Sequence, residues 1–175
     1  EQTKRLCRLI AQQDPKNLAA RTLEFEAAAR AEDAAELKRL LDEIEKIEGQ
    51  GPVWLTGKAV WLRVQSKGKD KQALDEAQKC LAEARKLRPE WPRIPLLAAE
   101  IDDLQGQEDR ALENYLDALG RGERDTGALQ RALQLLYKRQ RYAEADKLLR
   151  QFGEQGIAFS SEVSRLAAAI SLQLE

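Results

Sequence analysis

The chain has 175 residues, with 29 Lys and Arg against 30 Asp and Glu, so its formal net charge is −1. This balance creates no field that would attract nucleic acid or an anionic membrane surface. More than half of the residues are Ala, Leu, Glu, Lys or Arg, which is typical of long helices, and Val, Ile and Thr are too rare for a sheet protein. There is no His, which removes the commonest general base and metal ligand.

Helical periodicity of the apolar residues runs through almost the whole chain, and short breaks containing Pro or Gly interrupt it at regular intervals. Because the breaks are short, successive helices should lie antiparallel as hairpins. No apolar run of about 18 residues occurs, so no segment is predicted to cross a membrane. The breaks separate about ten predicted helices, near residues 1–13, 17–31, 33–48, 52–67, 70–88, 92–105, 107–119, 125–139, 141–153 and 159–174.

The sequence is similar to itself at a spacing of 34 residues. Ala77, Ala111 and Ala145 form a series with this spacing, and a large apolar residue follows each of them four positions later. Leu37, 40 residues before Ala77, and Thr3, a further 34 residues back, extend the series. A small residue lets the paired helix approach closely, and the large residue one turn later fills the space beside it. The series therefore predicts stacked helix hairpins, with Ala111 and Ala145 buried inside their pairs.

A helix–turn–helix unit of this length resembles the tetratricopeptide repeat (TPR) family. Residues 95–119 and 129–152 carry the resemblance best, and Trp54, Gly57 and Trp61 are similar to the opening residues of the family's motif. The resemblance is weakest over residues 18–48. It implies an all-α protein, a right-handed α-solenoid of stacked antiparallel helix hairpins with about ten helices.

The register of the repeats predicts that residues 1–175 form a single TPR-like solenoid segment. It would contain about four full repeats plus a half repeat at each end. The chain opens in a predicted second helix that ends at Pro15 and closes in a predicted first helix at 160–175. The closing helix places Val163 and Ile170 on one apolar face, and the chain contains no Met. We therefore expect an internal segment of a longer TPR array.

The resemblance implies a non-enzymatic scaffold that binds a peptide or protein partner in a concave groove. The alternative is a structural spacer or self-assembly segment of a larger bacterial TPR protein, without a groove ligand. A mixed polar and aromatic groove would favour ligand binding, whereas a groove of Ala and ion pairs would favour the spacer. Carried over by repeat spacing, the expected groove residues are Trp54, Lys58, Trp61, Arg93, Glu100, Asp103, Gln130, Gln134 and Tyr137.

Two sets of these residues allow more than one interpretation. Trp54 and Trp61 are seven residues apart on one helix face, so they are either core anchors or a pocket for a ligand peptide. Glu100, Asp102 and Asp103 either lie on the inner surface of the superhelix or form a metal or acid–base cluster. Asp102 is unusual because Leu136 lies 34 residues later, so Asp102 is either partly buried with a partner or on an open surface.

The sequence predicts no catalytic residue, metal site or cofactor. The glycine-containing stretch 120–123 lacks the following Lys-Ser or Lys-Thr of a phosphate-binding loop. Cys7 and Cys80 are interpreted as small buried residues, although a disulfide between them stays open. The Lys and Asn set with which some TPRs hold a carboxyl terminus is missing, since Asn17 is the only Asn at the edge of a first helix.

The expected partner is thus a protein or peptide of unidentified kind, or a second copy of the chain. Nucleic acid and direct membrane insertion of this segment are not expected. A soluble segment of this kind suits either a cytoplasmic or an envelope-associated parent protein.

Overall fold

The computed structural model describes residue 14 and residues 16–156 and 158–174. Regular secondary structure in these residues is entirely helical, which confirms the predicted all-α fold. Nine predicted helices are confirmed to within a few residues at their ends, and the one predicted at 1–13 lies outside the described residues. The described helices are α2 (Leu18–Arg30), α3 (Ala34–Glu48), α4 (Pro52–Gln65), α5 (Lys71–Leu87), α6 (Arg93–Leu104), α7 (Glu108–Gly120), α8 (Thr126–Lys138), α9 (Tyr142–Glu154) and α10 (Ser161–Ser171).

Short polar side chains start most of these helices. A side-chain oxygen of the capping residue accepts a hydrogen bond from a backbone N–H of the first turn and so satisfies a donor that the helix leaves free. This is seen at Asn17, Asp33, Asp70, Asp125 and Ser160. The start of each of these helices is therefore encoded locally.

The turn inside each helix pair has a repeated backbone geometry. One residue after the capping residue of each first helix, the chain adopts a left-handed conformation, with φ of 52°, 51°, 72° and 57° at Glu32, Lys67, Gly106 and Gln140. The next N–H then donates to the carbonyl oxygen five residues earlier, as from Arg141 to Leu136. This turn reverses the chain and fixes each hairpin.

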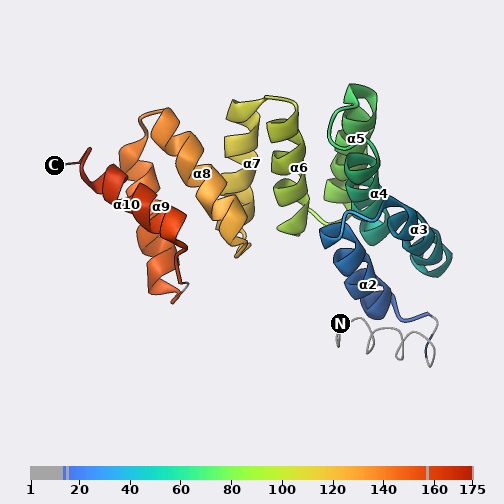
Figure 1. The fold of residues 1–175 in the computed structure, drawn as a ribbon. Helices are drawn as coiled ribbons and strands as arrows, with labels where there is room; N and C mark the ends of the chain where they lie inside the picture. The colour runs from blue at the N-terminus through green and yellow to red at the C-terminus, as the bar shows by residue number, and fades with distance from the viewer. Residues whose placement is uncertain (1–13, 15, 157, 175) are drawn as a thin grey trace.

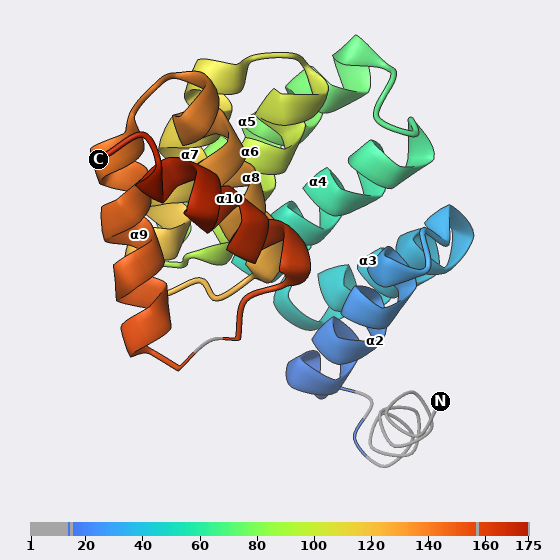
Figure 2. The same cartoon turned by 60° about the vertical axis from the view of Figure 1, so that its left-hand side comes forward.

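The helices pack as consecutive pairs, α2 with α3, α4 with α5, α6 with α7 and α8 with α9, and α10 packs on both α8 and α9. The pairs lie side by side in a row along the chain, and α10 lies across the last pair (Figures 1 and 2). The first helices also contact one another, α2 with α4, α4 with α6 and α8 with α10. This is the predicted stack of helix hairpins.

The core lies within and between the pairs. Ala111 and Ala145 are fully buried, at 0% exposure, which confirms the prediction made from their spacing. Each lies three residues after the first residue of its helix, whereas Ala77, also buried, lies six residues after Lys71. Helix α5 has 17 residues and α7 has 13, so the spacing of 34 residues does not carry an identical register back to α5.

The apolar face of α10 is covered by the preceding pair. Val163 and Ile170 are buried, and Leu166 and Ala167 pack partly buried against the same core. Among the described residues, no helix has the length and apolar character needed to cross a bilayer.

Candidate functional site

Trp54, Lys58 and Trp61 share one side of α4, and this side is turned towards second helices. Lys58 Nζ lies 2.6 Å from Glu76 Oε1 of α5 and 5.6 Å from the centre of the Trp54 ring. Lys38 of α3 lies 5.7 Å from the centre of the Trp61 ring. Each ring therefore lies near a cation, and these contacts place the tryptophan side of α4 towards α3 and α5. The structure does not place these three residues with the other expected groove residues.

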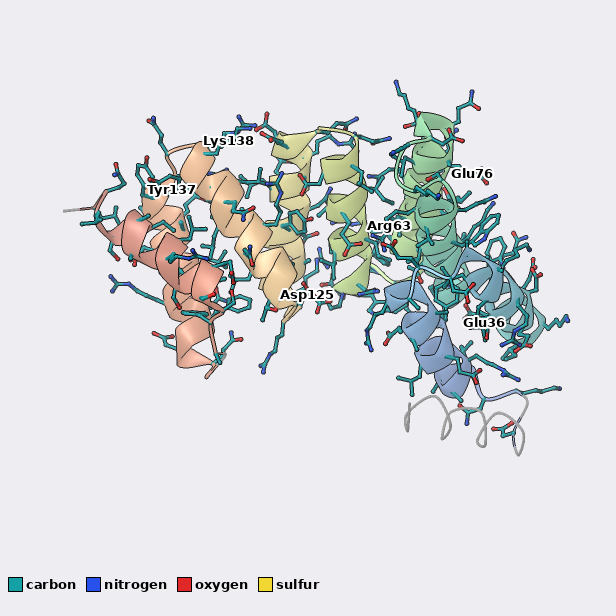
Figure 3. All side chains as sticks on the ribbon, viewed as in Figure 1. Glu36, Arg63, Glu76, Asp125, Tyr137 and Lys138 are labelled. Atoms are coloured by element: carbon teal, nitrogen blue, oxygen red, sulfur yellow. The ribbon has the colours of Figure 1, made fainter. Side chains whose placement is uncertain are left out.

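Glu100 and Asp103 instead face neighbouring first helices. Arg63 reaches from α4 towards α6, with Nη1 3.5 Å from Glu100 Oε2 (Figure 3). Asp103 accepts two hydrogen bonds from Arg131 of α8, at 2.6 and 2.8 Å. The two ion pairs thus run from α4 through α6 to α8. Glu100 and Asp103, two of the expected groove residues, therefore each lie beside an arginine that offsets the charge of the carboxylate.

The pair formed by Glu100 and Arg63 is loose. Neither Glu100 Oε2 nor Arg63 Nε has a hydrogen-bond partner, although both atoms are buried. Burial raises the pKa of Glu100 above its ordinary value, and the charges of Arg63 and Arg93 limit that rise. The glutamate is therefore held between two guanidinium groups without a good hydrogen bond to either.

The remaining expected residues lie on first helices. Arg93, half-buried at the start of α6, has no ion-pair or hydrogen-bond partner among the described residues. On α8, Gln130 is half-buried and Gln134 is exposed, and Arg131 Nη1 donates to Gln134 over 3.3 Å. The Tyr137 ring packs edge-on against Tyr142, with 5.4 Å between centroids. The first helices α2, α4, α6 and α8 together form one surface, which includes Arg93, Gln130, Gln134 and Tyr137. We call this surface the first-helix face.

An apolar hollow opens between α2, α4 and α6, and the sequence did not predict it. It is partly open to solvent, and its cavity volume is about 40 Å³. Only Arg93 of the expected residues lines it. The main apolar lining residues are Phe25, Val53, Val60, Trp91 and Leu97. We call this the α2–α6 hollow.

Gly57 explains how α2 approaches α4 closely enough to form one wall of the hollow. A Cβ at this position would lie 3.1 Å from Leu41 Cδ1 and 3.4 Å from Phe25 Cζ. The glycine thus allows α4 to approach both α2 and α3 closely. The spacing of Val53 and Val60 on one side of α4 was the available signal for the hollow. The helix opposite was predicted, but the resemblance to the repeat family is weakest over residues 18–48, so its position against α4 was not.

Asp102 is fully buried and hydrogen-bonded, which decides between the two interpretations of its position. Gln78 Nε2 of α5 donates to one carboxylate oxygen over 2.9 Å, and Asn114 Nδ2 of α7 donates to the other over 2.8 Å. Burial raises the pKa of Asp102, and the hydrogen bond from Asn114 opposes that rise. Asp102 therefore connects helices within the stack.

The three neighbouring carboxylates thus have three separate sets of partners. Among the described residues, no group of three or more His, Cys, Asp or Glu side chains is arranged to hold a metal ion. Cys80 is a free, buried thiol in α5, and Cys7 lies outside the described residues.

The helix pairs and their first-helix contacts define an α-solenoid of helix hairpins. No protein-family model and no curated protein sequence matches the chain. Solved structures match over almost its whole length. A thermophilic TPR protein of Thermus thermophilus aligns with a TM-score of 0.70 and 14% identity, covering 98% of this chain and 88% of that one.

Two further structures show the same fold. Cut9–Hcn1, a hetero-tetramer of the APC/C, aligns with a TM-score of 0.72 and 12% identity, covering 98% of this chain and 32% of that one. The present chain therefore spans about a third of the length of that protein. PilF of Pseudomonas aeruginosa aligns with a TM-score of 0.63 and 18% identity, covering 96% and 79% of the two chains. The fold is that of a TPR-like solenoid.

Proposed function

We propose that the protein is a non-enzymatic protein–protein interaction scaffold and that a peptide or protein partner binds its first-helix face. The observation that carries the proposal is the juxtaposition of the α2–α6 hollow with the unpaired Arg93 on this face, within the part of the chain that the structure describes. Apolar pockets with a few placed polar groups are the usual form of a binding site. The TPR-like fold supports the same class of function, as in the protein complex Cut9–Hcn1.

Two parts of the first-helix face have different roles in this proposal. The α2–α6 hollow gives apolar contact area, and Gln130, Gln134 and Tyr137 give a polar and aromatic surface on α8. Between these parts, Asp103 joins α6 to α8 through Arg131, and Glu100 lies beside Arg63 of α4 in a loose ion pair. The proposed binding surface therefore has one apolar end and one polar end, with Glu100 and Asp103 between them.

Site-specific photo-crosslinking tests this proposal. A photoreactive amino acid at Gln134 or at Ala29 on the first-helix face should form a crosslink with a partner in cells that produce the protein. The same residue at Glu113, exposed on α7, is the matched control and should form none. Crosslinks from position 113 alone, or from no position, would contradict the proposal.

A structural spacer is the second candidate, and the ion pairs favour it. Arg131 and Asp103 join α8 to α6 through two hydrogen bonds, which stiffens the stack. Arg63 and Glu100 offset each other's charge between α4 and α6, so this carboxylate is not left free for a ligand. A spacer predicts no crosslink from either surface. A self-assembly segment predicts crosslinks between copies of the chain, which a mass measurement of the crosslinked product identifies.

A further inference from the structure

The walls of the α2–α6 hollow are apolar even where their residues are polar. The hydroxyl groups of Thr22 and Thr56 donate to carbonyl oxygens of their own helices, at 2.8 and 2.9 Å. Their methyl groups are therefore available to the hollow, beside Val53, Val60 and Leu97. Water in such a space finds few hydrogen-bond partners, so an apolar group that replaces it gains free energy.

The α6 side of the hollow carries the guanidinium group of Arg93. Arg93 lines the hollow and has no ion pair among the described residues, and Glu100 nearby already has Arg63 at 3.5 Å. The carboxylates of Asp125 and Glu123 also act on Glu100, so the charge available to a partner here is that of Arg93 alone. On the α2 side, Glu26 also lines the hollow, but Arg30 lies 3.7 Å from it. A partner's carboxylate is therefore favoured on the α6 side.

From this arrangement we propose that the α2–α6 hollow receives the end of an aliphatic or aromatic side chain of a partner segment. Arg93 then pairs with an acidic residue next to that side chain. The inference rests on the proposed scaffold function and names the chemistry of the partner. Burial of the apolar side chain supplies affinity, and the charge on Arg93 selects acidic over basic neighbours.

Trp91 provides a direct readout, because it lines the hollow while Trp54 and Trp61 lie on the other side of α4. The probes are short capped peptides of the form Gly-Ser-Glu-Phe-Gly-Ser, with Lys in place of Glu or Ala in place of Phe. In NMR titrations of the whole chain, the Glu-Phe peptide should shift the Trp91 indole signal and leave the other two indole signals in place. It should bind roughly threefold to fivefold more tightly than the Lys-Phe peptide, as expected for one partly exposed ion pair.

Substitutions then test each part of the site. Arg93→Glu should invert the preference, so that the Lys-Phe peptide binds better. Arg93→Gln, the neutral variant to use if the charge reversal lowers stability, should abolish the preference. Ala29→Trp, on the wall of the hollow, should remove binding while the helical spectrum is kept. Lys79→Glu makes the same change of charge as Arg93→Glu at a position of α5 outside the hollow and should leave both affinities unchanged.

Several results would overturn the inference. They are equal binding of the Glu and Lys peptides to the wild type, equal binding of the Phe and Ala peptides, and shifts of the Trp54 or Trp61 signals in place of Trp91. The absence of any binding at millimolar peptide would also overturn it. In that case crosslinks from Gln134 would still support the scaffold function, so the two proposals fail separately.

Discussion

Asp102 of α6 and Asn114 of α7 are joined by a hydrogen bond of 2.8 Å between Oδ2 and Nδ2, although the aspartate is completely buried. The other carboxylate oxygen accepts from Gln78 of α5, and Gln78 also donates to the backbone carbonyl of Ala98. One buried acid therefore connects three helices from two consecutive pairs. Such a network is stabilising only while every member is satisfied.

Replacement of Asp102 by Ala should lower the free energy of unfolding by about 1–3 kcal/mol, because the half-buried amide groups of Gln78 and Asn114 each lose a hydrogen-bond acceptor. Urea-induced unfolding measures the loss. Glu113→Ala, at an exposed position of α7, is the control and should have little effect. Equal stabilities of the two variants would show that the network contributes nothing.

The pH dependence of stability should reveal the burial of Glu100. Because burial raises its pKa above the ordinary value of 4.5, the folded state binds the proton more tightly than the unfolded state. This contribution to stability is fully present below the unfolded pKa and is lost as the pH rises through the folded pKa. Wild type and Glu100→Gln should therefore be similar in stability when the glutamate is protonated in both states, at a pH below its unfolded pKa. The variant should be the more stable of the two at a pH above the folded pKa.

Denaturant titrations at several pH values check this expectation, with the exposed Glu83→Gln as control. If Glu100→Gln is instead the less stable protein at neutral pH, the attraction of Arg63 and Arg93 outweighs the burial of the carboxylate.

The close approach of helices within a pair should make Ala145 intolerant of a larger side chain. Ala145→Leu is expected to cost about 1–3 kcal/mol, since it adds volume to a fully packed site. Ala143→Leu, two residues earlier on the same helix and not buried, is the matched control. Thermal unfolding of both variants compares the two positions, and a similar midpoint for each would refute the packing inferred for this pair.

The bond between Asp103 and Arg131 should couple the last two complete pairs. In a double-mutant cycle with Asp103→Asn and Arg131→Gln, we expect a coupling of about 0.5–1.5 kcal/mol, because the pair is bidentate and only partly exposed. Salt should reduce this coupling. The pair formed by Glu83 and Lys86 on the surface of α5 serves as comparison and should couple less strongly. An undetectable coupling for Asp103 and Arg131 would mean that apolar packing alone sets the position of α8.

Contacts between helices decided which of the expected groove residues lie together. Sequence spacing placed Trp54, Trp61 and Glu100 in one groove, because each is on a first helix. A first helix in a stack has neighbouring helices on several sides. Which neighbour a residue of α4 contacts depends on where α3 and α5 pack against it. Lys38 and Glu76, which are distant in sequence, mark the tryptophan side as one that faces second helices.

The amino-acid sequence by itself determined the helices, their limits and their pairing. Local signals carry this information: capping residues such as Asp33 and Asp125, short links, and the small residues Ala111 and Ala145 at a spacing of 34. Only the tertiary structure decided the α2–α6 hollow, the pairing of Glu100 and Asp103 with arginines, and the burial of Asp102. These features depend on distances between residues of different pairs, which periodicity along one helix does not encode.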